Sequence, residues 1–332
     1  MKILVIQTAF IGDVILGTAV VEKLAAFHPN AEIDFLVRKG NESLLQNNPH
    51  INEVLIWNKK ENKLANLWKM IRKVRSNRYD YIFNLHRFAT SGFITAFSRA
   101  KNKVGFDKNP LSFFFTKKIK HTIGNNYNNY LHEVDRNNLL IEPITDNKRV
   151  APKLYPSDKD FEAVTKYQSA PYICMAPASV WFTKQWAKEK WIELLNNIDS
   201  SYIIYLLGAP GDTDVCNEII NASHNKNVQN LCGQLSFLQS AALMKGAVMN
   251  YVNDSAPMHI ASAMDASVTA IYCSTVPYFG FGPLSSNSFI IETKESLDCK
   301  PCGLHGHKAC PKGHFKCAYT IEIKDVLAVL SK

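Results

Sequence analysis

The sequence lacks the glycine-rich motifs that often mark nucleotide sites in α/β proteins. Its 332 residues contain neither a G-x-G-x-x-G fingerprint nor a G-x-x-x-x-G-K-[ST] loop. The first motif binds the diphosphate of dinucleotides and the second binds the phosphates of ATP or GTP. Their absence argues against a dehydrogenase and against a P-loop nucleotide hydrolase.

Long apolar runs are also missing, and none approaches the ~20 residues of a membrane-spanning helix. The first residues form a strand pattern directly, without the charged leader, apolar segment and small-residue cleavage site of a secretory signal. We therefore expect a cytoplasmic protein. The length suits two domains at roughly 150 residues each, and the 46% hydrophobic and 20% charged content is that of a globular chain.

Acidic residues are scarce in the first half of the chain. Residues 1–150 hold 23 Lys and Arg against 13 Asp and Glu, a net charge of +10, whereas residues 151–332 hold 15 against 16. The densest basic segment has one acid, Glu61, and comprises Lys59, Lys60, Lys63, Lys69, Arg72, Lys73, Arg75 and Arg78. It is either a solvated helix face or a surface that attracts a phosphorylated lipid, a membrane or nucleic acid. No helix-turn-helix, RNP or zinc-finger pattern accompanies it, so nucleic acid is the least favoured partner.

Short β-branched runs alternate with helical spacing along the whole chain. Residues 2–6, 32–37, 53–57, 80–85 and 103–106 read as strands in the first half, and 172–176, 202–207, 247–252 and 268–272 in the second. Such alternation predicts parallel, doubly wound sheets. We expect an α/β protein with two Rossmann-like domains facing each other across a cleft, residues 1–150 and 151–332, with a linker at 142–156.

The first strand ends in a loop that closes on Gly12 and Asp13, just before a helix predicted over 14–26. In open α/β sheets, ligands bind outside the carboxyl ends of strands and at helix starts. We interpret Asp13 as a catalytic carboxylate. The alternative is a plain N-cap of the helix, worth ~1 kcal/mol.

In the second half, Asp254-Ser-Ala-Pro-Met-His259 follows a predicted strand. Pro257 suits the first turn of a helix, which places Asp254 and Ser255 at its N-terminus, where free N–H groups suit a diphosphate. His259 lies one turn further on. The alternative is that Asp254 or Ser255 only caps the helix and His259 is a buried core residue.

A second loop, Ser179-Val-Trp-Phe-Thr-Lys-Gln-Trp186, also follows a predicted strand. Lys184 in this loop could neutralise a departing diphosphate by charge and hydrogen bonding. The alternative is a surface lysine beside packing aromatic rings. Together these features indicate an enzyme that uses a nucleotide-diphosphate donor.

These motifs, in this order, resemble glycosyltransferase family 9, the ADP-heptose:lipopolysaccharide heptosyltransferases, over nearly the whole chain. The resemblance rests on Gly12-Asp13, Pro177-Ala-Ser179 with Lys184-x-Trp186, Leu231-Cys-Gly233 and Asp254-Ser-x-Pro-Met-His259. It departs from the family at Ala256, where a glycine is usual, and at Ala19, where a proline is common.

The resemblance implies a GT-B fold and an inverting transfer of heptose from ADP-heptose to the lipid A–Kdo inner core of lipopolysaccharide, without a catalytic metal. It implies that the N-terminal domain binds the acceptor, the C-terminal domain binds the nucleotide sugar, and Asp13 is the general base. The implied donor-site residues are Lys184, Asp254, Ser255 and His259, and we add Ser179, Thr183 and Gly233 as further candidates for donor binding. Our candidates for acceptor contacts in the first half are His86, Arg87, His132 and Arg136.

An acceptor at the inner face of the inner membrane would explain the basic first half, with helix 61–76 holding the protein there as a peripheral enzyme. Phe113-Phe-Phe115 lies in a loop, where it could contact substrate or membrane, or pack into the core.

Four of the eight cysteines cluster as Cys299-x2-Cys302-x7-Cys310-x6-Cys317. In a cytoplasmic chain this spacing favours a metal site over disulfides. Structural zinc is the leading interpretation, an iron–sulfur cluster is second, and free thiols are the third. No cofactor is expected for catalysis itself.

Two other functions remain open. The chain could be a GT-B transferase or epimerase that acts on another nucleotide sugar. It could instead be a non-catalytic, zinc-stabilised protein that binds anionic membranes.

Overall fold

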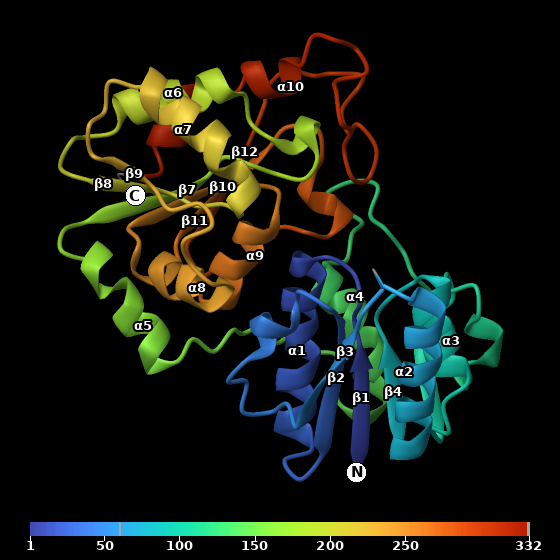
Figure 1. Ribbon diagram of the computed structural model, residues 1–332. Coiled ribbons are helices and arrows are strands. Elements are labelled where there is room, and N and C mark those ends of the chain that lie inside the picture. Colours follow the sequence, from blue (N-terminus) through green and yellow to red (C-terminus); the bar gives the residue numbers. More distant parts are fainter. Residues whose placement is uncertain (60, 331–332) are drawn as a thin grey trace. The chain divides into compact units, whose positions relative to one another are not determined.

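The computed structural model describes residues 1–59 and 61–330 of the chain. Lys60, a member of the predicted basic segment, and residues 331–332, the end of the predicted second domain, lie outside the described residues. The chain divides into two compact units (Figure 1). The first unit comprises residues 1–124 and 128–155, and the second comprises residues 125–127 and 156–332.

The first unit contains a six-stranded sheet in the order β3-β2-β1-β4-β5-β6, and all of its strand pairs are parallel. This is the strand order of a Rossmann sheet, in which the second and third strands are added on one side of the first strand and the fourth to sixth strands on its other side. The order of addition therefore reverses between the first and fourth strands. The strands are β1 (Lys2–Ile6), β2 (Glu32–Arg38), β3 (Glu53–Trp57), β4 (Tyr81–Asn84), β5 (Asn102–Phe106) and β6 (Lys117–Ile119).

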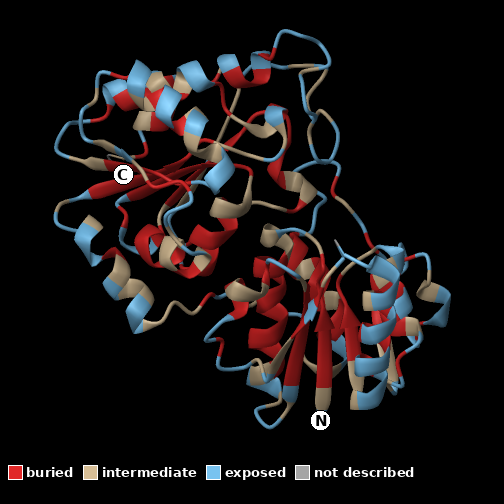
Figure 2. Ribbon diagram, viewed as in Figure 1, coloured by how far each residue is buried: buried red, intermediate tan, exposed pale blue. Residues whose placement is uncertain are grey.

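Helices cover both faces of this sheet. Helices α1 and α4 contact each other, as do α2 and α3, and a buried cluster fills the space between α2, α3 and the sheet. Figure 2 shows the strands buried and the outer helix faces exposed. The helical segments are α1 (Ile11–Phe27), η1 (Glu42–Leu45), α2 (Lys63–Asn77), α3 (Ala89–Ala96), η2 (Ser112–Phe114), α4 (Glu133–Ile141) and η3 (Glu142–Ile144).

The second unit repeats the design with a parallel sheet in the order β12-β11-β10-β7-β8-β9. Numbered within the unit, this is the same Rossmann order, and the order in which strands are added reverses between β7 and β10. The strands are β7 (Tyr172–Ala176), β8 (Ile203–Leu206), β9 (Val228–Asn230), β10 (Met249–Asn253), β11 (Val268–Tyr272) and β12 (Ser288–Glu292).

Helices again cover both faces, with α5, α8 and α9 in contact on one side and α6, α7 and α11 on the other (Figure 1). A buried cluster lies on the α6 side and includes Trp186 and Trp191. The longer helices are α5 (Asp158–Val164), α6 (Lys188–Asn197), α7 (Thr213–Ala222), α8 (Phe237–Gly246), α9 (Ala256–Ala263), α10 (Lys316–Tyr319) and α11 (Ile323–Leu327). The short turns are η4 (Thr165–Tyr167), η5 (Phe182–Lys184), η6 (Pro210–Asp212) and η7 (Pro277–Phe279).

Local sequence explains several helix starts. Ser157 and Ser236 each accept a hydrogen bond from the third helical N–H, and the side chains of Asp160 and Gln239 accept one from the N–H of the cap residue, which forms two capping boxes. Near the C-terminus the chain forms two short helices, α10 and α11, and α11 ends at Leu327. The second sheet extends beyond β11 to β12, which pairs with it.

No helix among the described residues is long and apolar enough to cross a membrane.

Candidate active site

The predicted site residues gather at the two points where the strand order reverses. In the first sheet, Asp13 follows β1 and His86 follows β4, and these two strands are neighbours. In the second sheet, Lys184 follows β7 and Asp254 follows β10, which are also neighbours. Ligands of doubly wound sheets bind at these crevices, outside the carboxyl ends of the strands.

Asp13 lies inside the first turn of α1. The helix begins at Ile11 with Phe10 as its N-cap, so the prediction of a helix beginning at residue 14, with Asp13 as a plain cap, is wrong. The carboxylate of Asp13 accepts a hydrogen bond from the backbone N–H of Phe10 at 3.2 Å. This bond fixes the side chain at the helix start while leaving its second oxygen available.

The surroundings of Asp13 tune its proton affinity. Burial, followed by the nearby Glu133 carboxylate, raises the pKa of Asp13 to about 6, against the opposing effects of the Phe10 N–H and the Arg87 guanidinium. The charge of Asp13 in turn favours the cationic form of Arg38. A carboxylate with a pKa near 6 is ionised at neutral pH and is a stronger base than an ordinary aspartate.

His86 lies beside Asp13's loop. Its Nδ1 is 3.1 Å from the Thr8 hydroxyl, which joins the ends of β1 and β4. Burial and the positive charges of Lys59, Arg87 and Arg38 lower the pKa of His86 to about 4. The imidazole is therefore neutral at neutral pH and can serve as a hydrogen-bond partner for a polar ligand, not as a cation.

His132 and Arg136, the other two predicted acceptor contacts, are buried. His132 is the N-cap of α4, and its Nδ1 accepts from the N–H of Val134 at 3.2 Å. Arg136 donates to Glu133 at 2.8 Å and to the carbonyl of Leu131 at 2.6 Å. The Glu133–Arg136 ion pair thus lies within the fold and holds in place the Glu133 carboxylate, whose negative charge acts on Asp13.

In the second unit, Lys184 and Asp254 form a direct ion pair. The Lys184 ammonium lies 2.6 Å from the Asp254 carboxylate, and both side chains are largely buried. The hydroxyl of Thr275, which follows β11, donates to the same carboxylate oxygen at 2.6 Å. Thr275 was missed by sequence reasoning, because a lone threonine after a strand carries no signal of its partner.

Helix α9 begins beside this pair. Ser255 is its N-cap, the position that the capping alternative gives it, but among the described residues its side chain makes no capping bond to the helix. Asp254 instead holds Lys184. His259 is buried one turn into α9, edge-on to the ring of Phe281 at a centroid distance of 6.4 Å.

The remaining predicted donor residues lie in the loops that follow β7 and β9. The backbone of Gly233 has a φ of +72°, and a Cβ there would lie 2.9 Å from Pro210, so only glycine fits this approach. Ser179 uses its carbonyl to accept from the side chain of Gln185 at 2.6 Å. Thr183 is buried, and its hydroxyl accepts from the backbone N–H of His307 at 2.7 Å.

The cysteine-rich segment therefore contacts the predicted donor site. Thr183 and His307 exchange two further contacts, and the N–H of Cys302 donates to the carbonyl of Ser274 at 2.7 Å. Gly306 has a φ of +75°, and a Cβ there would lie 2.8 Å from the Thr183 hydroxyl and 3.1 Å from the Lys184 side chain. Sequence reasoning missed Gly306, because its role depends on contacts with a loop more than 100 residues away.

Of the four clustered cysteines, all free thiols, three lie in the irregular segment between β12 and α10, and Cys317 lies within α10. Burial and the negative charges of Cys299 and Cys310 raise the pKa of Cys302, and the other three thiols act on Cys317. Among the described residues, no three His, Cys, Asp or Glu side chains are arranged to hold a metal ion.

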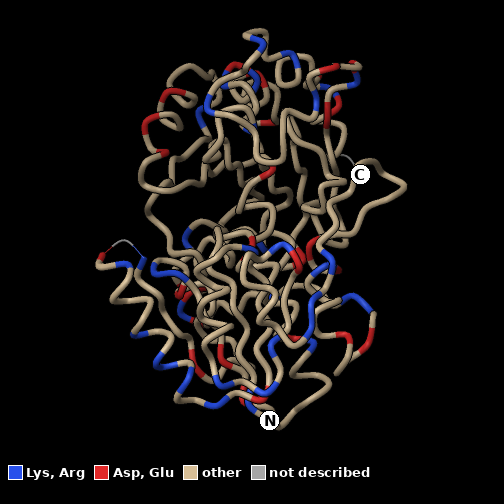
Figure 3. Tube along the Cα trace, turned by 90° about the vertical axis from the view of Figure 1, so that its right-hand side faces the viewer, with Lys and Arg blue, Asp and Glu red and all other residues tan. Residues whose placement is uncertain are grey.

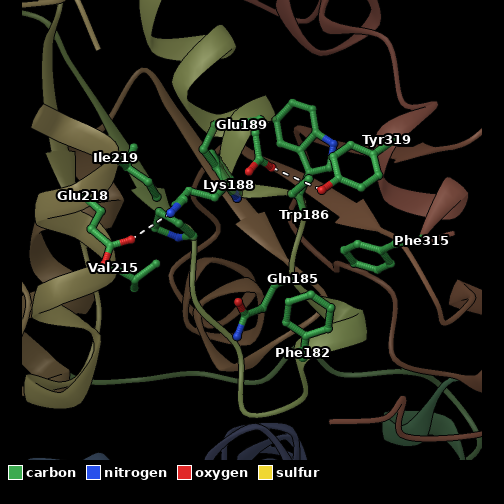
Figure 4. A pocket seen from close by; sticks show the side chains of 13 residues that line it. Phe182, Gln185, Trp186, Lys188, Glu189, Val215, Glu218, Ile219, Phe315 and Tyr319 are labelled. Carbon is green, nitrogen blue, oxygen red and sulfur yellow. Dashed lines mark hydrogen bonds and ion pairs between the residues drawn. The ribbon is translucent and has the colours of Figure 1, made fainter. Parts of the chain in front are cut away.

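A pocket of about 290 Å³ adjoins the Lys184 loop on the α6 side of the second sheet (Figure 4). Its walls include Phe182, Gln185, Phe315 and Tyr319, and Lys188 pairs with Glu218 along one side. The pocket is not lined by Lys184, Asp254 or His259. It is therefore separate from the predicted donor residues.

Comparison with known proteins gives a consistent picture. A sequence model described as glycosyltransferase family 9 (heptosyltransferase) matches residues 67–310. Lipopolysaccharide heptosyltransferase 3 of Escherichia coli is 27% identical over 292 residues, which cover 84% of this chain and 85% of that protein.

Solved structures share the fold over nearly the full length. A family 9 glycosyl transferase from Veillonella parvula matches with a TM-score of 0.83 at 20% identity, over 99% of this chain and 97% of that one. The E. coli ADP-heptose lps heptosyltransferase II matches with a TM-score of 0.79 at 22% identity, over 100% and 99%. The predicted fold class, α/β of GT-B type with two doubly wound sheets, is confirmed.

Proposed function

We propose a specific reaction for this chain, which belongs to glycosyltransferase family 9, the heptosyltransferases, as its sequence resemblance predicted. The chain is a glycosyltransferase. The proposed reaction is the inverting, metal-independent transfer of a heptose from ADP-heptose to the lipid A–Kdo inner core of lipopolysaccharide. The observation that carries this proposal is that one unit holds a carboxylate with a raised pKa, Asp13, and the other holds the Lys184–Asp254 ion pair, each after strands of its own sheet.

In this mechanism Asp13 is the general base. Its carboxylate takes the proton of the acceptor hydroxyl as the oxygen attacks the anomeric carbon of the donor sugar. The bond between that carbon and the diphosphate breaks in the same displacement, which inverts the configuration. ADP leaves with the negative charge that develops on its terminal phosphate oxygen.

The second unit would bind the donor and stabilise this leaving group. Lys184 supplies a positive charge held in place by Asp254, and the first turn of α9 supplies N–H groups near Ser255. Gly233 allows the close approach of the backbone to the loop at Pro210. His259, Ser179 and Thr183 complete the proposed donor site, with Thr183 acting through its bond to His307.

The first unit would bind the acceptor. His86 and Arg87 lie at the end of β4, next to Asp13, and are the proposed direct contacts with the phosphorylated sugar acceptor. The buried His132 and Arg136 would support that surface through α4, because their polar groups already have partners within the fold. We further propose that the protein works as a peripheral enzyme at the cytoplasmic face of the inner membrane, where such an acceptor is anchored.

The substitution Asp13→Asn tests the central role. Asn retains an oxygen that accepts from the Phe10 N–H, so the helix start is preserved while the base is lost. We expect turnover of ADP-heptose with a Kdo–lipid A acceptor to fall about 10²- to 10⁴-fold, with ADP affinity and thermal stability unchanged.

Asp160→Asn is the matched control. Asp160 also lies at the third position of a helix and accepts from the N–H of its cap residue, Ser157, at 2.8 Å. This control should keep full turnover. Near-normal turnover of the Asp13→Asn enzyme would refute the base assignment, and a changed sugar formed from the donor without acceptor would indicate an epimerase instead.

We also propose that Cys299, Cys302, Cys310 and Cys317 bind a structural zinc ion. The support is their spacing in the sequence and their mutual electrostatic influence. Binding would draw the four thiolates together around the ion and hold the segment that contacts Thr183. Catalysis itself needs no metal in this proposal.

Elemental analysis of protein purified without chelators tests the zinc proposal. We expect about one zinc ion per chain, and its loss in Cys299→Ser but not in Cys174→Ala, which removes a buried thiol from β7. Iron with sulfide would favour the iron–sulfur alternative. Metal-free protein with four reactive thiols would refute both.

A further inference from the structure

A cluster of exposed aromatic rings lies on the first unit and plays no part in the proposed chemistry. We call it the aromatic surface, and it consists of Leu64, Trp68, Phe93, Phe97, Phe113 and Phe114. These residues come from α2, α3 and η2, and all are exposed, Phe113 by 68% and Trp68 by 57%. Exposed large apolar patches on a folded protein mark interaction sites more often than single exposed residues do.

The rings of the aromatic surface form one connected group. Phe97 lies at its centre, with ring centroids 6.5 Å from Trp68, 6.0 Å from Phe93 and 6.4 Å from Phe114. Phe113 extends the group, 4.2 Å from Phe114. Three elements that are distant in sequence therefore present one continuous apolar face to solvent.

The core does not need these side chains. The buried face of α2 is formed by Leu67, Met70, Ile71 and Val74, which pack on the sheet. Leu64 and Trp68, four residues apart on the helix, share a different and exposed face. Of the three phenylalanines that the sequence placed in a loop, Phe115 is buried and covers Gly105, whereas the other two point outward.

Basic side chains border the aromatic surface. Helix α2 carries Lys63, Lys69, Arg72, Lys73 and Arg75 and no acid, and Lys108, Lys117 and Lys118 flank η2. Arg75 donates to the carbonyl of Phe97 at 3.1 Å, and Lys103 donates to that of Ala96 at 2.8 Å, so the charges adjoin the rings. In Figure 3, Lys and Arg recur along the unit that holds the N-terminus.

Few acids offset this charge. Glu53 pairs with Lys73 at 2.5 Å and Asp80 pairs with Lys101 at 2.7 Å, both at the edge of the basic region. Asp107 accepts from the backbone N–H of His121. The remaining cations on α2 and beside η2 leave the border of the aromatic surface positively charged.

We propose that the aromatic surface inserts into the interface of an anionic lipid bilayer, with the basic border contacting the lipid headgroups. Aromatic rings favour the membrane–water interface, and clustered Lys and Arg favour anionic headgroups. A second copy of the chain would bring two positively charged borders together, which disfavours a dimer through this face. This inference deepens the proposed function, since it names the surface that would hold the enzyme at a membrane-anchored acceptor.

Vesicle flotation with the full chain tests the proposal. We expect the protein to float with vesicles of phosphatidylcholine mixed with phosphatidylglycerol, and not with phosphatidylcholine alone. Phe113→Ser with Phe114→Ser should reduce binding at least about tenfold, and so should Arg72→Glu with Lys69→Glu. Val180→Ser, which removes an 80% exposed apolar side chain from the second unit, is the matched control and should bind normally.

Trp68 supplies a direct probe of insertion. The difference in emission between the native chain and Trp68→Phe isolates its signal, which should shift to shorter wavelength on anionic vesicles and be quenched by brominated lipid. Binding that is independent of anionic lipid, or unaffected by the phenylalanine substitutions, would overturn the proposal. So would a dimer in solution, or a complex with single-stranded nucleic acid, that is lost in the same variants.

A water-soluble acceptor lacking the acyl chains separates this proposal from the proposed function. The phenylalanine variants should transfer sugar to it at the native rate while losing activity on acceptor embedded in vesicles. If the native chain transfers no sugar to either acceptor yet floats with anionic vesicles, the proposed function fails and the membrane surface stands. If the native chain transfers sugar but never floats with vesicles, the membrane surface fails and the proposed function stands.

Discussion

At the scale of single residues, the proton affinity of Asp13 depends on the balance of charges around it. Glu133 favours the protonated acid and Arg87 favours the carboxylate, while burial acts in the same direction as Glu133. A base must be deprotonated to act, so the reaction rate should fall as the pH drops below the pKa of Asp13, about 6. The position of this acid limb therefore depends first on burial and is then adjusted by two neighbouring side chains.

Opposite shifts of the acid limb are expected for two substitutions. Glu133→Gln removes a negative charge, which lowers the pKa of Asp13 and moves the acid limb of kcat/KM to lower pH. Arg87→Met removes a positive charge, which raises that pKa and moves the limb to higher pH. The pH profile of kcat/KM between pH 4.5 and 8, a range spanning about 1.5 to 2 units on either side of the pKa, measures both.

The pH at which kcat/KM falls is informative even if the maximum value of kcat/KM changes. Arg87 is also a proposed acceptor contact, and Glu133→Gln removes the carboxylate that pairs with the buried Arg136, so both variants should lose some activity or stability. A limb that stays fixed in both variants would show that the titrating group is not Asp13.

Single residues also mark the limit of sequence reasoning. Asp13, Lys184 and Asp254 could be predicted as site residues because each is a charged residue just after a strand pattern. Thr275 and Glu133 could not, because each acts on a charged group more than 20 residues away, and no local pattern encodes that meeting. The ion pair between Lys184 and Asp254 was missed for the same reason, although both members were chosen.

At the scale of elements, strand interiors were easier to predict than sheet edges. Buried strands such as β1 and β7 are continuous apolar runs, whereas β6 has two exposed lysines and β12 is only partly buried. Edge strands need fewer apolar residues, so their pattern is weak. The start of α1 was placed three residues late because Phe10, an apolar cap, gives none of the usual capping signal.

The contact between the cysteine-rich segment and the Lys184 loop yields a prediction at this scale. Gly306→Ala adds a methyl group 2.8 Å from the Thr183 hydroxyl and should displace Thr183 and Lys184. We expect the KM for the nucleotide-sugar donor to rise at least about tenfold, since small displacements of positioning groups are costly. Steady-state kinetics with varied donor measure it.

Gly313→Ala is the matched control. Gly313 has nearly the same backbone conformation, with a φ of +71° against +75°, but a Cβ there meets nothing within 4 Å. Both variants should lose about 1 kcal/mol of stability from the strained backbone. Only Gly306→Ala should alter donor binding, and equal donor KM values in the two variants would contradict a role for this contact.

At the scale of the whole molecule, the two units share a strand order but differ in chemistry. The first holds the basic excess, the aromatic surface and the proposed base, whereas the second holds the Lys184–Asp254 pair and all eight cysteines. Repetition of one architecture with different residues after the strands is typical of doubly wound folds, where the strand ends carry the function. The sequence could predict this division because charge and cysteine content are visible without the fold.

The uneven distribution of cysteines allows the stability of the second unit to be followed alone. Cys174 and Cys273 are buried and should react with a thiol reagent only when that unit opens, whereas hydrogen exchange of β1 and β4 reports on the first unit. With ADP at about 100 times its Kd, the free energy of opening of the second unit, measured by thiol labelling in urea, should rise by about 2.7 kcal/mol. Hydrogen exchange in β1 and β4 should change much less.

Adenosine, which lacks the diphosphate, should stabilise neither unit. Lys184→Met should remove most of the stabilisation that ADP gives to the second unit. Equal protection of both units by ADP would contradict the assignment of the donor site to the second unit alone.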